Sequence, residues 1–129
     1  MIYVHSTDTG AVQPWEYMPA TAGTYQAGQM LTTKNGALSP ISAAMTTTPG
    51  YICMANITVA EGDNIPVTRV QKDAVYETQL SAKAESAAIG AKLQVSAGGL
   101  QVDAAAAGTF ELTYVDGTEA GDMVRGRFV

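Results

Sequence analysis

The chain has few cationic residues and lacks any long apolar run. Of its 129 residues only 7 are Lys or Arg, against 12 Asp or Glu, so the formal net charge is −5. A nucleic-acid interface requires a positively charged stripe, and the scattered cations form none, so we expect no nucleic-acid partner. No apolar run approaches the ~20 residues of a membrane span, and the first residues lack the charged and apolar regions of a signal peptide. We therefore expect a protein that is made and used inside a cell, or in a particle assembled there, without a membrane partner.

Cysteine and histidine are equally scarce, which limits the available chemistry. Cys53 and His5 are the only residues of their kinds. A lone cysteine excludes an intrachain disulfide and a cysteine-pair metal site, and we interpret Cys53 as a small buried apolar residue. No Walker-type loop, Gly-x-Ser-x-Gly or His-Glu-x-x-His motif occurs. The acidic stretch 116–122 lacks the spacing of a calcium loop and is interpreted as a solvated hairpin loop, with a weak calcium site as the alternative. The sequence predicts no enzyme, no metal and no cofactor.

One short motif points the other way. Asp8-Thr9-Gly10 spells the triplet around the catalytic carboxylate of aspartic proteases, whose retroviral-type members assemble one active site from two chains. In those enzymes an apolar strand carries the aspartate to the subunit interface, where two carboxylates share a proton. Here the three residues before Asp8 are all polar. We interpret the triplet as a polar turn and keep a retroviral-type aspartic protease as a remote alternative.

Short β-prone runs separated by Gly, Pro, Asn and Asp predict an all-β fold. Asn35-Gly36 between two such runs predicts a tight hairpin, and alternation over 74–80 predicts a strand with one buried face. Residues 50–59 are interpreted as one long buried strand. Pro66 inside another strand indicates an edge position or a bulge. The alanine-rich stretch 80–89 is the only helical candidate, so we expect at most one short helix.

An internal repeat is the most specific feature of the chain. Residues 28–41 align with 90–103 at an offset of 62, and residues 61–70 align with 120–129 at an offset of 59. The matched pairs are Gly28 with Gly90, Leu31 with Leu93, Gly36 with Gly98, Leu38 with Leu100, Gly62 with Gly121, Asp63 with Asp122, and Val70 with Val129. Glycine permits the positive φ of a tight turn, and aspartate bonds back to nearby amides. We interpret the pattern as a structural duplication; the alternative is chance reuse of glycine turns.

The repeat divides the chain into three parts. Residues 25–75 form β unit 1, and residues 76–129 form β unit 2, packed with unit 1 as one compact barrel or sandwich. Residues 1–24 precede both units as an extended, proline-punctuated N-terminal arm. The arm is either a strap across its own domain or a segment that pairs with a neighbouring chain by strand addition. In the second case Trp15 and Tyr17 are the candidate partner contacts, because such residues dominate binding hot spots.

The order of these motifs resembles a family of phage head proteins. Three stretches carry the resemblance. They are Tyr-x-Ala-Gly-x-x-Leu leading to a glycine hairpin and Pro-Ile, a Pro-Gly-Tyr-Ile strand, and Val-Ala-Glu-Gly-Asp-x-Ile-Pro-Val-Thr-Arg-Val. They are similar to the turn patterns of the small capsid decoration (cement) proteins of tailed bacteriophages, the group of the phage lambda head-stabilising protein. The resemblance covers residues 25–70 best, with 90–129 as the second copy.

This resemblance implies a structural role. It implies a β-tulip-like or barrel-like protein, often a trimer, that binds the major capsid protein on the outside of the head and clamps neighbouring subunits. It also implies a virion location after synthesis in the cytoplasm of the bacterial host. The duplicated unit departs from the single-domain lambda form. The alternatives are another particle component, such as a head-fibre base or a tail-associated β module, and an unrelated cytoplasmic β-barrel binding domain.

Overall fold

The protein is an all-β chain, as its sequence predicts. The computed structural model describes residues 1–129 and contains 13 strands and no helix. The strands are β1 (Tyr3–Thr7), β2 (Glu16–Pro19), β3 (Gly23–Tyr25), β4 (Met30–Lys34), β5 (Ala37–Pro40), β6 (Tyr51–Cys53), β7 (Ile57–Val59), β8 (Asn64–Arg69), β9 (Ala74–Gln79), β10 (Lys92–Val95), β11 (Val102–Asp103), β12 (Phe110–Val115) and β13 (Met123–Phe128). The chain thus has no helix of the length and apolarity that crossing a membrane requires.

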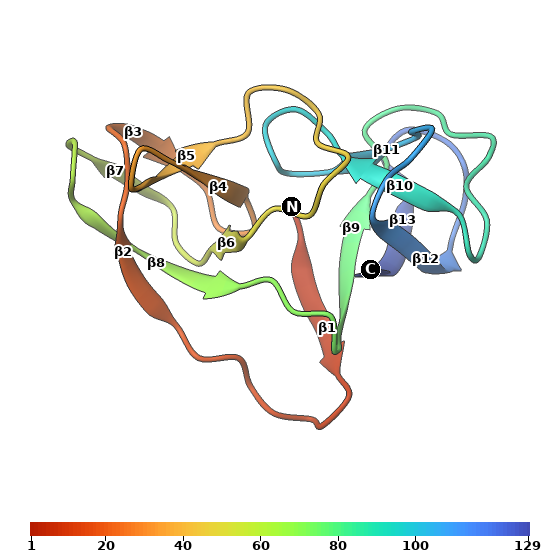
Figure 1. Ribbon diagram of the computed structural model, residues 1–129. Helices are drawn as coiled ribbons and strands as arrows, with labels where there is room; N and C mark the ends of the chain where they lie inside the picture. The colour runs from red at the N-terminus through yellow and green to blue at the C-terminus, as the bar shows by residue number, and fades with distance from the viewer.

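Two curled antiparallel sheets lie side by side (Figure 1). One has five strands in the order β2-β8-β6-β4-β5, and the other has six in the order β1-β9-β13-β12-β10-β11. A small two-stranded sheet, β3-β7, lies beside the first. Each large sheet curls until two of its strands meet at a parallel bridge. Ala20, just after β2, meets Leu38 on β5 in the first sheet, and Leu80, just after β9, meets Val102 on β11 in the second, with β1 outside the closure. This closure gives each sheet a barrel-like form.

The two sheets share one strand order, and the register agrees except in the last strand pair. There Val95 lies opposite Val102, whereas Thr33 lies opposite Leu38, so β10–β11 and β4–β5 differ by two positions at the offset of 62. Apart from β1, the order β2-β8-β6-β4-β5 corresponds to β9-β13-β12-β10-β11. The pair Leu31 and Tyr51 in the first sheet corresponds to Leu93 and Phe110 in the second. Leu31 and Leu93 are 62 positions apart, and Tyr51 and Phe110 are 59 apart, which are the two offsets of the sequence repeat.

Equivalent turns in the two sheets also have equivalent hydrogen bonds. The Gly28 N–H donates to the Cys53 carbonyl, and the Gly90 N–H donates to the Leu112 carbonyl, both at 2.8 Å. All six glycines of the aligned turns have positive φ, the region that glycine adopts without strain. Their φ values are 83° at Gly28, 79° at Gly36, 84° at Gly62, 90° at Gly90, 90° at Gly98 and 88° at Gly121.

Residues 1–24 cross both sheets of their own chain. β1 pairs with β9 in the six-stranded sheet, and β2 pairs with β8 in the five-stranded sheet. Ile2, just before β1, is fully buried and donates its N–H to the Gly28 carbonyl at 2.8 Å. The segment therefore forms a strap across its own domain, the first of the two arrangements that the sequence left open. The connection between β1 and β2 lies at the lower edge of the molecule (Figure 1).

The core joins the two sheets. A cluster of 7 buried residues, including Leu31 and Val67, fills the five-stranded sheet. A larger cluster of 16 lies mainly in the six-stranded sheet but also contains Met30 and Ile52 from the other. Backbone hydrogen bonds reinforce this junction, such as that from the Met30 N–H to the Gly99 carbonyl at 2.7 Å.

The helical candidate at 80–89 is wrong, because long-range contacts override its alanine propensity. The Ala84 N–H donates to the Thr118 carbonyl at 2.9 Å rather than to a residue four positions back. The Ala87 N–H donates to Ala84, three positions back, at 3.0 Å, so the segment makes a turn. Both alanines are buried, and burial fixes the segment against the sheet as an irregular connection.

Two further expectations about strands need correction, while the hairpin is confirmed. Asn35-Gly36 forms a two-residue loop, with φ of 52° and 79°, between β4 and β5. Pro66 lies in β8, which is an interior strand and not an edge. Pro66 lies beside Met54, just past the end of β6 at Cys53. Its carbonyl accepts from the Met54 N–H at 3.0 Å, so only the reciprocal hydrogen bond that an N–H would donate is missing. The stretch 50–59 is divided into β6 and β7 by the break at 54–56.

Candidate functional site

Asp8-Thr9-Gly10 forms the polar turn that leaves β1. The Asp8 N–H donates to the Asp73 carbonyl at 2.8 Å, and the Gly10 N–H donates to the Thr7 carbonyl at 3.1 Å. Gly10 has a φ of 74°, which glycine adopts without strain. The triplet therefore follows a strand at the edge of its sheet and turns the chain toward β2.

The Asp8 carboxylate is part of a surface ion pair. Its Oδ1 lies 2.7 Å from Nη2 of Arg127 on β13, and both side chains are partly exposed. The hydrogen bond from Arg127 to Asp8 raises the pKa of the Arg127 guanidinium above its ordinary value. A shared-proton dyad requires two carboxylates in contact, whereas Asp8 contacts a cation. Within one chain, the geometry favours a role for Asp8 in fixing the turn to β13.

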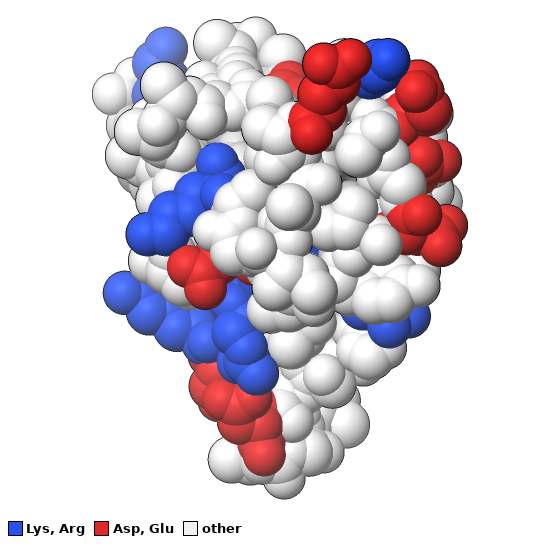
Figure 2. Space-filling view, turned by 90° about the vertical axis from the view of Figure 1, so that its right-hand side faces the viewer, with Lys and Arg blue, Asp and Glu red and all other residues white.

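Other charged side chains of the six-stranded sheet and its connections are also paired. Figure 2 shows Lys and Arg gathered mainly along one margin and Asp and Glu mainly along the other, with uncharged surface between them. Arg125 contacts Glu77 at 3.0 Å, and Lys83 lies within 3.7 Å of both Glu85 and Glu119. No group of three or more His, Cys, Asp and Glu side chains is arranged to hold a metal ion.

Asp63 and Asp122, the aspartates of the repeat, fix turns by hydrogen bonds to the backbone. The Asp63 Oδ2 accepts from the Ala60 N–H at 3.1 Å, and the Asp122 Oδ2 accepts from the Glu119 N–H at 2.9 Å. Asp122 belongs to the acidic stretch 116–122. Its carboxylate is therefore occupied in shaping the hairpin loop that the sequence indicated.

Trp15 and Tyr17 are among the most exposed large apolar side chains. Trp15 is 53% exposed and Tyr17 is 67% exposed, while Val12 in the preceding connection reaches 93%. Neither ring has a hydrogen-bonded partner within the chain. Aromatic residues in this state bury much area at low cost in conformational entropy when a partner covers them. The structure thus places both sequence-predicted contact residues on accessible surface along β2.

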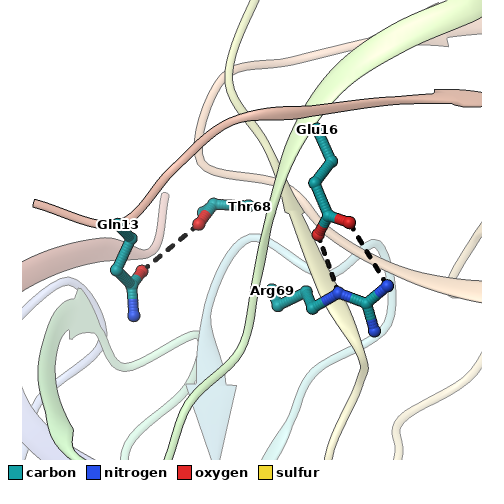
Figure 3. Close-up of polar contacts among 4 residues, drawn as sticks. All are labelled: Gln13, Glu16, Thr68 and Arg69. Atoms are coloured by element: carbon teal, nitrogen blue, oxygen red, sulfur yellow. Dashed lines mark hydrogen bonds and ion pairs between the residues drawn. The ribbon is translucent and has the colours of Figure 1, made fainter.

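The strap beneath these aromatics is fixed to β8 by polar contacts. Glu16 forms a two-point ion pair with Arg69, at 2.7 Å and 3.3 Å, and Gln13 accepts a hydrogen bond from Thr68 at 3.4 Å (Figure 3). The hydrogen bond with Glu16 raises the pKa of Arg69 above its ordinary value. These contacts hold Trp15, between Gln13 and Glu16, in a defined position.

A shallow groove separates the strap from the five-stranded sheet. Two adjoining hollows of about 350 and 300 Å³ share Val4, Met54 and Thr68 in their walls. Their lining is largely apolar and includes no Asp, Glu, Lys or Arg, and His5 lines the first hollow. Buried Cys53 borders the second hollow, and its Sγ donates to the Ala55 carbonyl at 3.2 Å. Burial raises the pKa of the Cys53 thiol, so the thiolate that reacts as a nucleophile is disfavoured.

The fold and its surface define a class of all-β protein in which two equivalent curled sheets are crossed by one strap. No family model matches the chain, and no curated protein matches its sequence. Sequence reasoning missed the two ion pairs of Asp8 and Glu16, because their partners lie 119 and 53 positions away. No local sequence signal identifies such partners.

Proposed function

We propose that this protein is a non-enzymatic structural component of a tailed-phage virion that binds the outside of the capsid and stabilises it. The residues that carry the family resemblance support this role, because they are the residues that build the turns of both sheets. Gly28, Gly62 and Asp63 each have a counterpart with the same backbone geometry in the second sheet. The proposal thus rests on the sequence resemblance, on the corresponding turns of the two sheets, and on the exposed aromatic residues of the strap.

The duplication itself is part of this proposal. The matching strand order, the shared register of β4–β6 and β10–β12, and the matching turn hydrogen bonds support two copies of one ancestral unit. Two similar units in one chain suit a lattice, where a protein contacts several copies of the major capsid protein and modest affinity at each contact suffices. In this role the protein is synthesised in the bacterial cytoplasm and resides on the virion exterior.

Partner contacts come from exposed residues of the strap. Trp15 and Tyr17 are the proposed anchors, since they combine large apolar area with exposure. The resemblance further implies self-association, with three copies as the usual number. The net charge of −5 limits non-specific adhesion to DNA during assembly.

The test uses heads of the phage or prophage whose genome carries this sequence, prepared with the gene deleted. Purified protein is added, and the heads are sedimented away from free protein. We expect saturable binding at a fixed number of copies per head, density on the outer surface by electron microscopy, and a higher temperature of DNA release. Binding to tails alone would instead identify the protein as a tail-associated module. Binding to neither particle part would refute a virion role.

A further inference from the structure

β2 has an unpaired outer edge at a position that is covered in the other sheet. β2 is the outermost strand of its sheet, whereas its counterpart β9 is covered by β1. Pro19 on β2 lies opposite Asn64, and Gln79 on β9 lies opposite Met123, so β2 and β9 correspond at an offset of 60. β1 covers residues 74–77 of β9. The equivalent positions on β2 are residues 14–17, and no strand of this chain covers them.

The backbone groups at this edge are free to bond. The Met54 N–H donates to the Pro66 carbonyl at 3.0 Å, so the Pro66 carbonyl faces β6 and away from β2. Tyr17 lies opposite Pro66. In an antiparallel strand pair, the backbone groups of two opposed residues either both face each other or both face away. Because the Pro66 carbonyl faces away from β2, the Tyr17 N–H and C=O face away from β8 and point outward. Trp15 immediately precedes β2, and continuing the alternation of the strand by one residue directs its N–H and C=O outward as well. Neither residue forms a backbone hydrogen bond outside the sheets.

We propose that this edge pairs in antiparallel fashion with the same edge of a second copy of the chain, about a two-fold axis near Glu16. In this register Trp15 of each copy lies opposite Tyr17 of the other. Each copy supplies two N–H and two C=O groups, so the four hydrogen bonds are mutually satisfied. A second copy is the occupant that we propose, because it satisfies every outward group of this short edge and brings its own Arg69 to balance Glu16.

The ends of the edge limit the pairing to this short segment. Pro14 and Pro19 lack the N–H that a longer ladder requires. Beyond Pro19 the edge is already taken, since the Thr21 N–H donates to the Leu38 carbonyl on β5 at 2.9 Å. Only the stretch between the prolines is open, and it has the length that the two-fold register uses.

The side chains near the axis are compatible with two-fold pairing. The axis brings two Glu16 carboxylates together, and like charges directly opposed destabilise a strand pair. Each Glu16, however, is already paired with Arg69 at 2.7 Å, so the four charges sum to zero. Trp15 and Tyr17 become covered in the dimer, which removes the largest exposed aromatic area of the strap from water. This inference does not rest on the capsid role. It assigns Trp15 and Tyr17 to a second copy in place of the capsid protein, and it sets the number of copies at two in place of three.

The experiment combines mass with the emission of Trp15, the only tryptophan. Sedimentation equilibrium and tryptophan emission are recorded over the same concentration series for the wild type and three Tyr17 variants. Tyr17→Pro removes the outward N–H without removing a hydrogen bond to β8, and Tyr17→Lys adds charge to the edge. Tyr17→Phe keeps both the ring and the N–H and is the matched control. Far-ultraviolet circular dichroism establishes that each variant is folded.

We expect a mass of twice 13.4 kDa, with a blue shift of Trp15 emission that follows dimer formation. Tyr17→Pro and Tyr17→Lys should weaken the dimer at least tenfold, and Tyr17→Phe less than threefold. If Tyr17→Pro unfolds, the Tyr17→Lys variant decides alone. A monomer at every concentration, or an oligomer of any size that both edge variants leave unchanged, overturns the proposal. A trimer that both edge variants leave unchanged overturns the β2 pairing but not the capsid role. The head-binding assay tests the capsid role separately.

Discussion

Asp63 and Asp122 occupy the same position in two successive units, and each carboxylate accepts a hydrogen bond from the backbone N–H three residues earlier. The distances are 3.1 Å from Ala60 and 2.9 Å from Glu119. Each aspartate also follows a glycine with positive φ. The correspondence shows how a short Gly-Asp signal specifies a turn: glycine permits the bend, and the carboxylate satisfies an amide that the bend leaves without a strand partner.

The first prediction concerns these two carboxylates. Asp63→Ala and Asp122→Ala should each lower the free energy of unfolding by about 1 kcal/mol, because each removes a hydrogen bond to a turn amide. Urea unfolding monitored by circular dichroism measures the change. Glu85→Ala is the control, since Glu85 is exposed and bonds no backbone group; it should change stability by less than about 0.5 kcal/mol. Equal effects in all three variants would contradict a turn-fixing role.

Local sequence signals predicted the elements, whereas long-range contacts decided the exceptions. The Asn35-Gly36 hairpin and the alternation of β9 were predictable, because turn chemistry and strand period are local properties. The alanine-rich stretch did not become a helix, since Ala84 bonds to Thr118 on a distant hairpin. Pro66 is tolerated in an interior strand because it lies just past the end of β6, where its carbonyl still accepts from the Met54 N–H. A single sequence does not encode such neighbours locally.

The sequence indicated which residues form the candidate contact surface, but not where in the fold they lie. The exposure of Trp15 and Tyr17 agrees with their choice as contact residues. Their place on an open strand edge was not predictable, because it depends on β1 covering β9 and not β2. The same strap therefore closes one sheet and leaves an edge on the other.

A second prediction compares two equivalent glycines. Gly28 and Gly90 both have positive φ, so alanine is strained at either position. At Gly28 an added Cβ would also lie 2.8 Å from the Met1 Cβ and 3.2 Å from the Ile2 nitrogen, whereas at Gly90 it would meet nothing within 4 Å. Gly90→Ala should cost about 1 kcal/mol. Gly28→Ala should cost clearly more in the same urea unfolding assay, and a cost no larger than that of Gly90→Ala would show that the strap does not press on this turn.

A third prediction uses the buried thiol. Burial raises the pKa of Cys53 in the folded protein. A group whose folded pKa is raised stabilises the fold below its unfolded pKa, and this contribution is lost as pH rises through the folded pKa. Stability should therefore fall as the pH rises past about 8.5, the ordinary value for a free thiol.

The measurement for Cys53 is a difference between two proteins. Wild type and Cys53→Ala are unfolded in urea from neutral pH to pH 10, and their stability difference is plotted against pH. Tyrosine and lysine titrations are common to both proteins and cancel. We expect the advantage of wild type over the variant to shrink at high pH. A difference that is independent of pH would mean that the thiol titrates alike in the folded and unfolded states.

The last prediction concerns the junction between the two sheets, where Gly99 approaches Met30. The Met30 N–H donates to the Gly99 carbonyl at 2.7 Å, and a Cβ at Gly99 would lie 2.3 Å from the Met30 carbonyl oxygen. The atoms that obstruct this Cβ all belong to the Met30 backbone, and Gly99 has a φ of 75°. Alanine therefore cannot be accommodated by moving a side chain. Gly99→Ala should therefore destabilise the protein by more than about 2 kcal/mol.

Because the larger core cluster contains residues of both sheets, the two sheets should still unfold together. Trp15 emission reports on the five-stranded sheet and circular dichroism on the whole chain, so coincident transitions are expected in wild type and variant alike. Separate transitions in the wild type would show that the sheets are independent units, and separation in the variant alone would locate their coupling at this contact.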